Sequence, residues 1–369
     1  MSTHDLYTSP VAASTWDVPL AGDARFTWEY DDGRDKLLAL YQKGKDKQWD
    51  SVKRIDWDLE VDPQNVLGVP DQSLAIYGTP HWDKMSERDR GELRRHSSSW
   101  QFSQFMHGEQ GAMITAARIV ESVPDLDAKF YSATQTMDEA RHVEIFSRFL
   151  QDKVGLVYPI NTKLQDLLAE TLDDSRWDMP YLGMQVLIEG LALAAFGVIR
   201  DITTKPLPKQ ILTYVMQDEA RHVAFGRLAL RDHYRELSAP ELREREEFVI
   251  EGCHLMRDRI RGREIWENFG INPAEVDELV TNSPYMRMFQ SLLFSRIVPC
   301  VKDIGLWSPR IRATFEEMGV LEASRADLDA LMRGDEEQAE RLDAERFAAE
   351  EAERKAEVDD VIAAEAATS

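Results

Sequence analysis

Hydrophobic positions recur three and four residues apart over most of the chain, which is typical of helices with one buried face. Proline and glycine divide this pattern into segments. Ser86, with Asp89 three residues later, makes a weak helix start, and Pro124 ends the segment that follows. The pattern predicts four long helices, over about residues 86–123, 125–153, 180–202 and 208–237, and a shorter one over about 162–172.

The segments on either side of these helices differ in pattern. Residues 1–85 predict an irregular N-terminal arm that packs its aromatic side chains on the main body and contains one short helix, over 35–48. Residues 86–238 form the predicted four-helix core. Residues 239–334 predict buttressing helices, over 240–269, 273–282 and 285–305. Residues 335–369 are strongly acidic and predict a solvated helix or a disordered tail.

Tight connections between consecutive long helices predict two antiparallel hairpins that pack together. The expected fold class is therefore all-α, a four-helix bundle with additional flanking helices. Such a bundle can bury a sizeable core, because 43% of the residues are hydrophobic.

One hexapeptide occurs twice in these helices. Asp138–Val143 and Asp218–Val223 have the same sequence, Asp-Glu-Ala-Arg-His-Val. Glu109 and Glu189 each precede the glutamate of one copy by 30 residues. The midpoints of these intervals fall at predicted helix connections, so each glutamate should meet its Glu-x-x-His partner halfway along a hairpin.

Glutamate and histidine three positions apart project from nearly the same face of a helix and can share one cation. Carboxylate and imidazole together suit iron or manganese better than a thiolate-seeking metal. Glu189 lies within an apolar helix, where an unpaired carboxylate would cost several kcal/mol. The sequence therefore predicts a two-metal site whose ligands are Glu109, Glu139, His142, Glu189, Glu219 and His222.

Four further charged residues adjoin these ligands, at Asp138, Arg141, Asp218 and Arg221. Histidines that bind metal usually donate their other N–H group to a carboxylate. Our hypothesis is that each aspartate orients a histidine across the bundle and pairs with an arginine. The alternative is that these residues form ordinary ion pairs on the helix surface.

Charge and composition exclude several classes of function. The net charge of −23 disfavours nucleic acid, anionic membranes and acidic carrier proteins as partners. The two cysteines, Cys253 and Cys300, form no metal-binding pair. The N-terminus lacks the features of a signal peptide, and the most apolar stretch, 187–199, is too short to span a bilayer. We expect a soluble, cytoplasmic protein.

The repeated Asp-Glu-x-Arg-His, each copy with a preceding glutamate, resembles the ferritin-like carboxylate-bridged di-iron proteins, over roughly residues 86–238. This superfamily includes hydroxylase subunits of bacterial multicomponent monooxygenases and the small subunit of ribonucleotide reductase. The resemblance implies Glu109, Glu139 and His142 for one iron, and Glu189, Glu219 and His222 for the other. It also implies O₂ as co-substrate; a mixed Mn/Fe pair and a homodimer are compatible with it.

At three positions the sequence departs from particular groups of di-iron proteins, which narrows the range of reactions. Phe146 stands where ribonucleotide reductase small subunits commonly have a radical tyrosine, which argues against a tyrosyl radical. Val215 stands where di-iron N-oxygenases of arylamines add a third histidine, which weakens an N-oxygenase assignment. Leu193 stands where multicomponent monooxygenases often have a threonine.

Apolar residues one turn from the ligands are candidates for a small hydrophobic substrate pocket, with Gln104 and Gln185 as polar contacts. The predicted pocket residues are Phe105, Ala112, Phe146, Gln185, Ala192, Leu193 and Phe196. For each of them, plain core packing is the alternative.

We therefore expect a di-iron oxygenase or oxidase that hydroxylates, desaturates or otherwise oxidises a small hydrophobic molecule. No Gly-rich dinucleotide loop is evident, so electrons must come from a separate reductase or ferredoxin, or from peroxide. The alternatives are a ferroxidase-like metal-handling protein, a ribonucleotide reductase-like subunit without the radical, and a non-catalytic assembly subunit.

Overall fold

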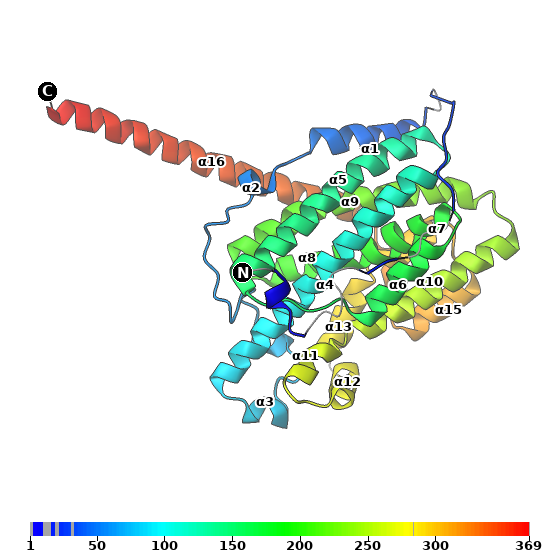
Figure 1. The fold of residues 1–369 in the computed structure, drawn as a ribbon, viewed down its shortest axis with the longest axis horizontal. Coiled ribbons are helices and arrows are strands. Elements are labelled where there is room, and N and C mark those ends of the chain that lie inside the picture. Colours follow the sequence, from blue (N-terminus) through cyan, green and yellow to red (C-terminus); the bar gives the residue numbers. More distant parts are fainter. Residues whose placement is uncertain (1–2, 10–15, 19–21, 31–32, 283, 369) are drawn as a thin grey trace.

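The structure is a computed structural model that describes residues 3–9, 16–18, 22–30, 33–282 and 284–368. The described part is all-α, as predicted, and contains no strand; Tyr7 and Val157 form one isolated bridge. Four long helical segments lie side by side in a bundle, and shorter helices cover its sides and one end (Figure 1).

The first hairpin of the bundle joins α4 (Glu87–Ser122) to α5 (Leu126–Phe149). Ser86 and Asp89 form a reciprocal capping box at the start of α4, so the weak signal in the sequence marks a real helix start. Pro124 lies in the turn, and the Asp125 side chain accepts a hydrogen bond from the Ala128 amide at the start of α5. A π-helical turn, η3 (Leu150–Val154), extends α5.

The second hairpin joins α7 (Asp178–Tyr181), η4 (Leu182–Ile188) and α8 (Glu189–Ile202), which are continuous, to α9 (Pro206–Tyr234). The predicted helix over 180–202 is present, but η4 is a π-helical segment that the sequence did not predict. It ends directly before Glu189. Helices of this kind are rare and frequently occur at functional sites.

Residues Asp178–Ile202 are long and apolar enough to cross a membrane by length and composition. In this fold, however, 83% of the most apolar window is buried inside the protein. The segment is therefore the core helix of the bundle, which is consistent with a soluble protein.

Flanking helices surround the bundle on the N-terminal and C-terminal sides. Gly262 adopts a left-handed conformation (φ 54°) and separates α10 from α11, so the predicted helix over 240–269 is two helices. The predicted helix over 285–305 is likewise divided, into α13 and α14. The longer flanking helices are α1 (Asp35–Asp46), α6 (Thr162–Asp173), α10 (Ala239–Arg259), α11 (Arg263–Asn268), α12 (Pro273–Asn282), α13 (Pro284–Leu293), α14 (Ile297–Asp303) and α15 (Pro309–Glu317). The shorter ones are η1 (Thr3–Leu6), α2 (Ser51–Arg54), η2 (Asp71–Ser73), α3 (Pro80–Lys84) and η5 (Leu321–Arg325).

The N-terminal arm does not pack all its aromatic side chains on the main body, so that prediction was wrong. Phe26, Trp28 and Tyr30 are 70%, 84% and 64% exposed, and Trp16 is 42% exposed. Residues 10–15, 19–21 and 31–32 of the arm lie outside the described residues. Farther along, Trp49 and Trp57 do pack against the core.

The acidic C-terminal segment is helical, which is one of its two predicted forms, but the helix is packed on the bundle at its start instead of being solvated throughout. Helix α16 (Leu328–Thr368) lies along α9 at its start and projects from the body at its far end (Figure 1). Asp335 is 3% exposed and pairs with Arg200 (3.2 Å) and Arg296 (2.7 Å). Ala339, one turn later, is fully buried.

Asp335 should therefore be a stability determinant. Asp335→Ala leaves two buried guanidinium groups without their shared carboxylate, and we expect a loss of about 3 kcal/mol in the free energy of unfolding. Glu337→Ala, on the exposed side of the same helix, should change it by no more than about 0.5 kcal/mol. Urea unfolding followed by circular dichroism measures both. Equal effects of the two substitutions would show that the buried pairing does not anchor α16.

Candidate metal centre

The four helices of the bundle each bring one or two of the predicted ligands to its centre. Helix α4 supplies Glu109, α5 supplies Glu139 and His142, α8 supplies Glu189, and α9 supplies Glu219 and His222. All six side chains are buried. The repeat spacing thus brings together six residues that are up to 113 positions apart in sequence.

Their donor atoms form two overlapping groups, in each of which all atoms lie within 4.8 Å of one another. One group contains Glu109, Glu139, His142 and Glu219, and the other contains Glu139, Glu189, Glu219 and His222. Glu139 and Glu219 are common to both groups. Each group contains the three residues that the resemblance implies for one iron, together with one glutamate from the other half of the chain. Glu139 and Glu219 thus lie in the middle, and Glu109 and Glu189 lie at the ends; the assignment of ligands stays a prediction.

Unpaired polar atoms in the cluster indicate that it is built for cations. Glu139 Oε2, Glu189 Oε2, both Glu219 carboxylate oxygens and His222 Nδ1 make no hydrogen bond with any described residue. His222 Nδ1 lies 3.0 Å from Glu139 Oε1, and His142 Nδ1 lies 3.0 Å from Glu219 Oε1. In a neutral imidazole that donates through Nε2, Nδ1 carries a lone pair. Lone pairs facing carboxylate oxygens at this distance require protons or cations between them.

The donor set also fits two divalent ions by charge. Four carboxylates and two neutral imidazoles balance two divalent cations, and oxygen with nitrogen ligation suits iron and manganese. The buried cluster is therefore suited to binding two such ions.

Asp218 accepts three hydrogen bonds at a single oxygen, Oδ2. The donors are His142 Nε2 (3.2 Å), Arg141 Nη2 (2.9 Å) and Trp49 Nε1 (2.9 Å). Burial opposes ionisation of this carboxyl, but Arg221 and His142 hold its pKa well below the usual value. Asp218 is thus a carboxylate, and His142 must donate to it through Nε2.

Asp138 occupies the equivalent position for the other histidine. His222 Nε2 lies 3.3 Å from its Oδ2, and Arg221 Nη2 lies 3.4 Å from the same oxygen. Gln48 donates to Oδ1 at 2.7 Å. Each aspartate therefore contacts a histidine across the bundle and pairs with arginine, which is the contact pattern that we hypothesised from the sequence; its role in metal binding stays a prediction.

Three residues beside the centre were missed from the sequence. Gln135 donates through Nε2 to Glu189 Oε1 (2.8 Å) and to Glu139 Oε1 (3.1 Å). Its position one helical turn before Glu139 could have identified it. Gln48 and Trp49 come from the segment after α1, and no spacing in the sequence relates them to the repeated motif.

The predicted pocket residues are buried but tightly packed. The Phe105 and Phe196 rings lie edge to face with centroids 4.6 Å apart, and Phe146 lies 5.8 Å from Phe105 and 5.7 Å from Phe196. Ala112 is buried, and Ala192 is half-buried. These side chains form an aromatic and aliphatic wall around the ligands, and their role toward a substrate stays a prediction.

Three other residues that were predicted to contact a substrate do not belong to this aromatic wall. Leu193 lines a separate surface cavity beside Arg200 and Asp335. Gln104 binds the backbone of Pro159 and Asn161 and so holds a loop. The Gln185 side chain reaches Gln135 at 3.5 Å and lies behind the ligands.

Substitution of Asp138 and Asp218 tests directly whether their contacts with the two histidines support metal binding. We expect Asp218→Asn and Asp138→Asn each to lower Mn(II) affinity by about 10- to 100-fold, because the contacted imidazole loses its carboxylate acceptor. Asp232→Asn, an exposed position on α9, is the matched control and should leave affinity unchanged. Titration with a competing metal indicator measures all three; unchanged affinity in both buried variants would remove the aspartates from the site.

The pH dependence of stability gives a second test. Burial and neighbouring carboxylates raise the pKa of Glu109 and Glu189 well above the ordinary value of 4.5. Stabilisation by these protonated groups is complete below pH 4.5 and is lost as the pH rises through their raised pKa values. As the pH rises above 4.5, we expect the melting temperature of the metal-free protein to fall. The fall should be smaller in Glu189→Gln, and Mn(II) should restore the melting temperature of the wild type. If the melting temperature fell equally steeply with pH in the wild type and in Glu189→Gln, a raised pKa of Glu189 would be contradicted.

Comparison with solved structures identifies the fold. The chain is similar to an R2-like ligand-binding oxidase with an aerobically reconstituted metal cofactor, with a TM-score of 0.52 and 17% identity over 75% of this chain and 96% of that one. A variant of that oxidase with a Mn/Fe cofactor gives the same values. A protein from Synechococcus with aldehyde deformylating oxidase activity matches with a TM-score of 0.46 and 17% identity, over 61% of this chain and 97% of that one. At this identity the two R2-like oxidase structures, with TM-scores of 0.52, show a shared fold and no more.

The sequence itself identifies the family. None of the curated proteins that were compared matches the chain. The sequence profile of the family described as P-aminobenzoate N-oxygenase AurF matches residues 31–305, which include all six candidate ligands and both aspartates. The chain therefore belongs to the AurF family and is a di-iron oxidoreductase of the ferritin-like superfamily.

Proposed function

We propose that the protein uses O₂ to hydroxylate, desaturate or otherwise oxidise a small, neutral, apolar organic molecule. The observation that carries this proposal is a buried site, balanced for two divalent ions, with an aromatic wall beside it. Such a wall excludes water from the ligands and offers apolar contacts to a substrate.

The chain's own residues have distinct parts in this proposal. Glu139 and Glu219, which belong to both groups of donor atoms, would contribute to holding both ions, and Glu109 with His142 and Glu189 with His222 would complete the two ends. Bound iron, or a mixed Mn/Fe pair, supplies the redox chemistry with O₂. Asp138 and Asp218 accept the Nε2 protons and keep Nδ1 of each histidine directed at the ions.

Among the described residues, Gln135 is a neutral donor to two of the ligand carboxylates. Its Nε2 group lies 2.8 Å from Glu189 and 3.1 Å from Glu139, so it holds both in one orientation. We propose that this contact steadies Glu189 when the charge of the site changes during turnover.

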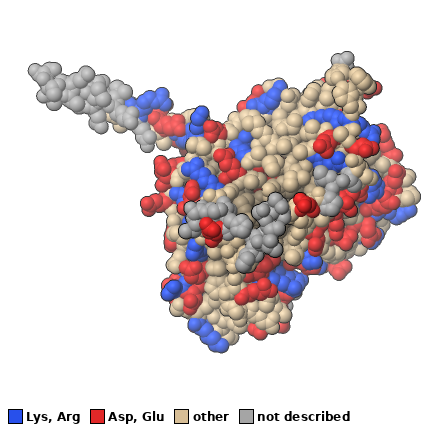
Figure 2. Space-filling model, viewed as in Figure 1, with Lys and Arg blue, Asp and Glu red and all other residues tan. Residues whose placement is uncertain are grey.

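Electrons must come from an external donor, a reductase or a ferredoxin. Acidic side chains are spread over the face seen in Figure 2 and gather over α10 and α15. A donor with a basic or neutral docking face therefore fits better than an acidic one. We also propose a cytoplasmic location; a homodimer is compatible with the described surface.

N-oxygenation of an arylamine is the second candidate, because the family description names that reaction. Val215, fully buried one turn before Glu219, occupies the position of the additional histidine that we associate with such enzymes. The donor set of this chain therefore departs from the N-oxygenase pattern. Ferroxidase-like metal handling is a weaker candidate, because the cluster is enclosed by aromatic side chains rather than open to entering ions.

The deciding experiment loads the protein with two Fe(II) under argon and exposes it to O₂ with neutral arenes or with arylamines. With ¹⁸O₂ as the oxidant, we expect ¹⁸O-labelled products from neutral arenes, or dehydrogenated products from arenes with an alkyl chain, both detected by mass spectrometry. The yield should drop on the order of 100-fold or more in Glu219→Ala because a shared ligand is lost. Glu236→Ala, exposed just after α9, is the control.

Other outcomes distinguish the candidates. Two bound metals that do not react with O₂ would refute the oxygenase proposal. Turnover of arylamines alone would favour N-oxygenation, and oxidation of many Fe(II) ions per chain without an organic product would favour metal handling.

A further inference from the structure

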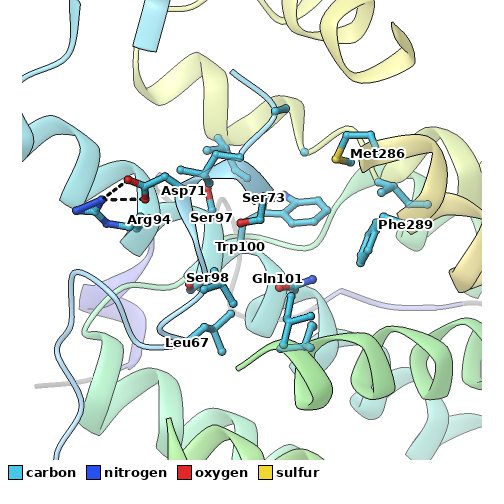
Figure 3. Close-up of a pocket in the computed structure, with 18 of the residues that line it drawn as sticks. Leu67, Asp71, Ser73, Arg94, Ser97, Ser98, Trp100, Gln101, Met286 and Phe289 are labelled. Carbon is cyan, nitrogen blue, oxygen red and sulfur yellow. Dashed lines mark hydrogen bonds and ion pairs between the residues drawn. The ribbon is translucent and has the colours of Figure 1, made fainter. Parts of the chain in front are cut away.

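A cavity of about 170 Å³ lies at one end of the bundle, and none of the six metal ligands is among the residues that line it. Two bundle helices, α4 and α8, form its floor, and the remaining walls come from flanking segments: residues 65–75, the connection between α10 and α11, and α13. In Figure 3 the Arg94–Asp71 pair lies at one end, Met286 and Phe289 lie at the other, and Trp100 and Gln101 lie between them. The flanking segments therefore enclose a space that the bundle alone would leave open.

The walls of this cavity are mainly apolar and carry no free charge. Leu67, Ile199 and Phe289 are among the lining residues. Two cations line the cavity, and both are paired. Arg94 pairs with Asp71 (3.0 Å) and Glu87 (2.6 Å), and Arg261 pairs with Asp258 (3.3 Å) and Asp277 (3.5 Å). An anionic ligand would therefore find no unpaired cation here, whereas a neutral apolar molecule would be accommodated at little electrostatic cost.

One hydroxyl group in the lining lacks a hydrogen-bond partner among the described residues. Ser97 Oγ is buried and makes no hydrogen bond with the residues that the structure describes. A buried hydroxyl without a partner is unfavourable, so a ligand that offers one hydrogen-bonding group would be held in a defined orientation.

The volume of the cavity sets the size of its ligand. An engineered apolar cavity of about 150 Å³ in another protein stays dry and binds benzene. At about 170 Å³, this cavity has room for a single six-membered ring with one or two small substituents.

Helix geometry places the cavity next to the metal centre. On α4, the cavity residue Gln101, then Phe105, then the ligand Glu109 follow at intervals of four residues, which corresponds to roughly 6 Å per step along one face. On α8, the cavity residue Ile199 lies three residues from Phe196. Phe105 and Phe196, whose rings are 4.6 Å apart, thus lie on these helices between the cavity residues and the ligands, although neither is among the residues that line the cavity.

We propose that this cavity binds a neutral, single-ring molecule with one hydrogen-bonding group, and that the Phe105–Phe196 pair is the gate through which the molecule reaches the metal centre. The binding site stands on the cavity alone, whereas the gate rests on the proposed function. Rotation of either ring about its side-chain bonds opens this gate without moving the helices.

Binding is tested first, with metal-free protein, so that it does not depend on O₂ chemistry. The probes are p-cresol, which is neutral, and benzoate, which has a similar size and a negative charge, followed by calorimetry and ligand-observed NMR. We expect p-cresol to bind with one site per chain and benzoate at least about tenfold more weakly, because its carboxylate would be buried without a cation.

Variants locate the site. Phe289→Trp and Ile199→Trp each fill the cavity and should abolish p-cresol binding, with melting temperatures reporting that the fold is intact. Met288→Trp, on the exposed side of α13 next to Phe289, is the matched control and should bind as the wild type does. Binding of p-cresol that survives both cavity-filling substitutions, or no binding to the wild type, would overturn the proposal.

The gate is tested by distance rather than by turnover. Mn(II) in the metal centre accelerates nuclear relaxation of a bound p-cresol with the inverse sixth power of their separation. We expect the enhancement to rise in Phe105→Leu, or in Phe196→Leu if the first variant does not fold, because the smaller side chain lets the ring approach the ions. An unchanged enhancement would overturn the gate.

These readouts separate the two proposals. Binding at the cavity with no product under O₂ refutes the proposed function and leaves the binding site in place. Product formation with no cavity binding, or with undiminished rates in both cavity-filling variants, refutes this inference and leaves the function in place.

Discussion

The constraint on which the structure depends is the burial of four carboxylates at the middle of one bundle. Together Glu109, Glu139, Glu189 and Glu219 would repel each other strongly in a medium of low dielectric constant. Two divalent ions remove that repulsion, and two histidines complete the coordination without adding charge. The surrounding set balances itself separately, since Asp138 and Asp218 pair with Arg141 and Arg221. The four ligand glutamates therefore need cations to offset their charge, whereas the two aspartates and two arginines around them offset one another.

The contacts of Asp138 and Asp218 explain why the segment after α1, which is far from the repeated motif in sequence, is part of the site. Gln48 and Trp49 donate to the two aspartates. Arg54 then stacks on Tyr214 (4.0 Å) and pairs with Asp343 of α16. A continuous set of contacts thus joins the N-terminal arm, the metal centre and the C-terminal helix. Enclosing the aspartates in this way keeps water from competing for the hydrogen bonds that orient the histidines.

The features that sequence could predict are those that follow from regular spacing. Helix periodicity and the turn at Pro124 gave the hairpins, and the 30-residue intervals brought all six candidate ligands together, because antiparallel helices align residues at equal distance from a turn. Features set by tertiary contacts were missed. The π-helical segment before Glu189 has no sequence period of its own, and the burial of Asp335 depends on Arg200 and Arg296, which are distant in sequence. The sharing of Glu139 and Glu219 is likewise a matter of distances between helices, which spacing along one helix does not determine.

Identical ligands can serve different reactions, so the choice of substrate has to come from what surrounds them. The fold is shared with oxidases at 17% identity, and the family match adds a reaction class, yet Val215 departs from the N-oxygenase pattern at the metal centre itself. What distinguishes this chain physically is the wall of Phe105, Phe146 and Phe196 and the neutral cavity behind it. A mainly apolar site whose charged side chains are already paired selects by size and by absence of charge, because it can hold a ring but cannot neutralise an anion. For this protein, specificity should therefore reside in α4, α8 and α13 rather than in the six ligands.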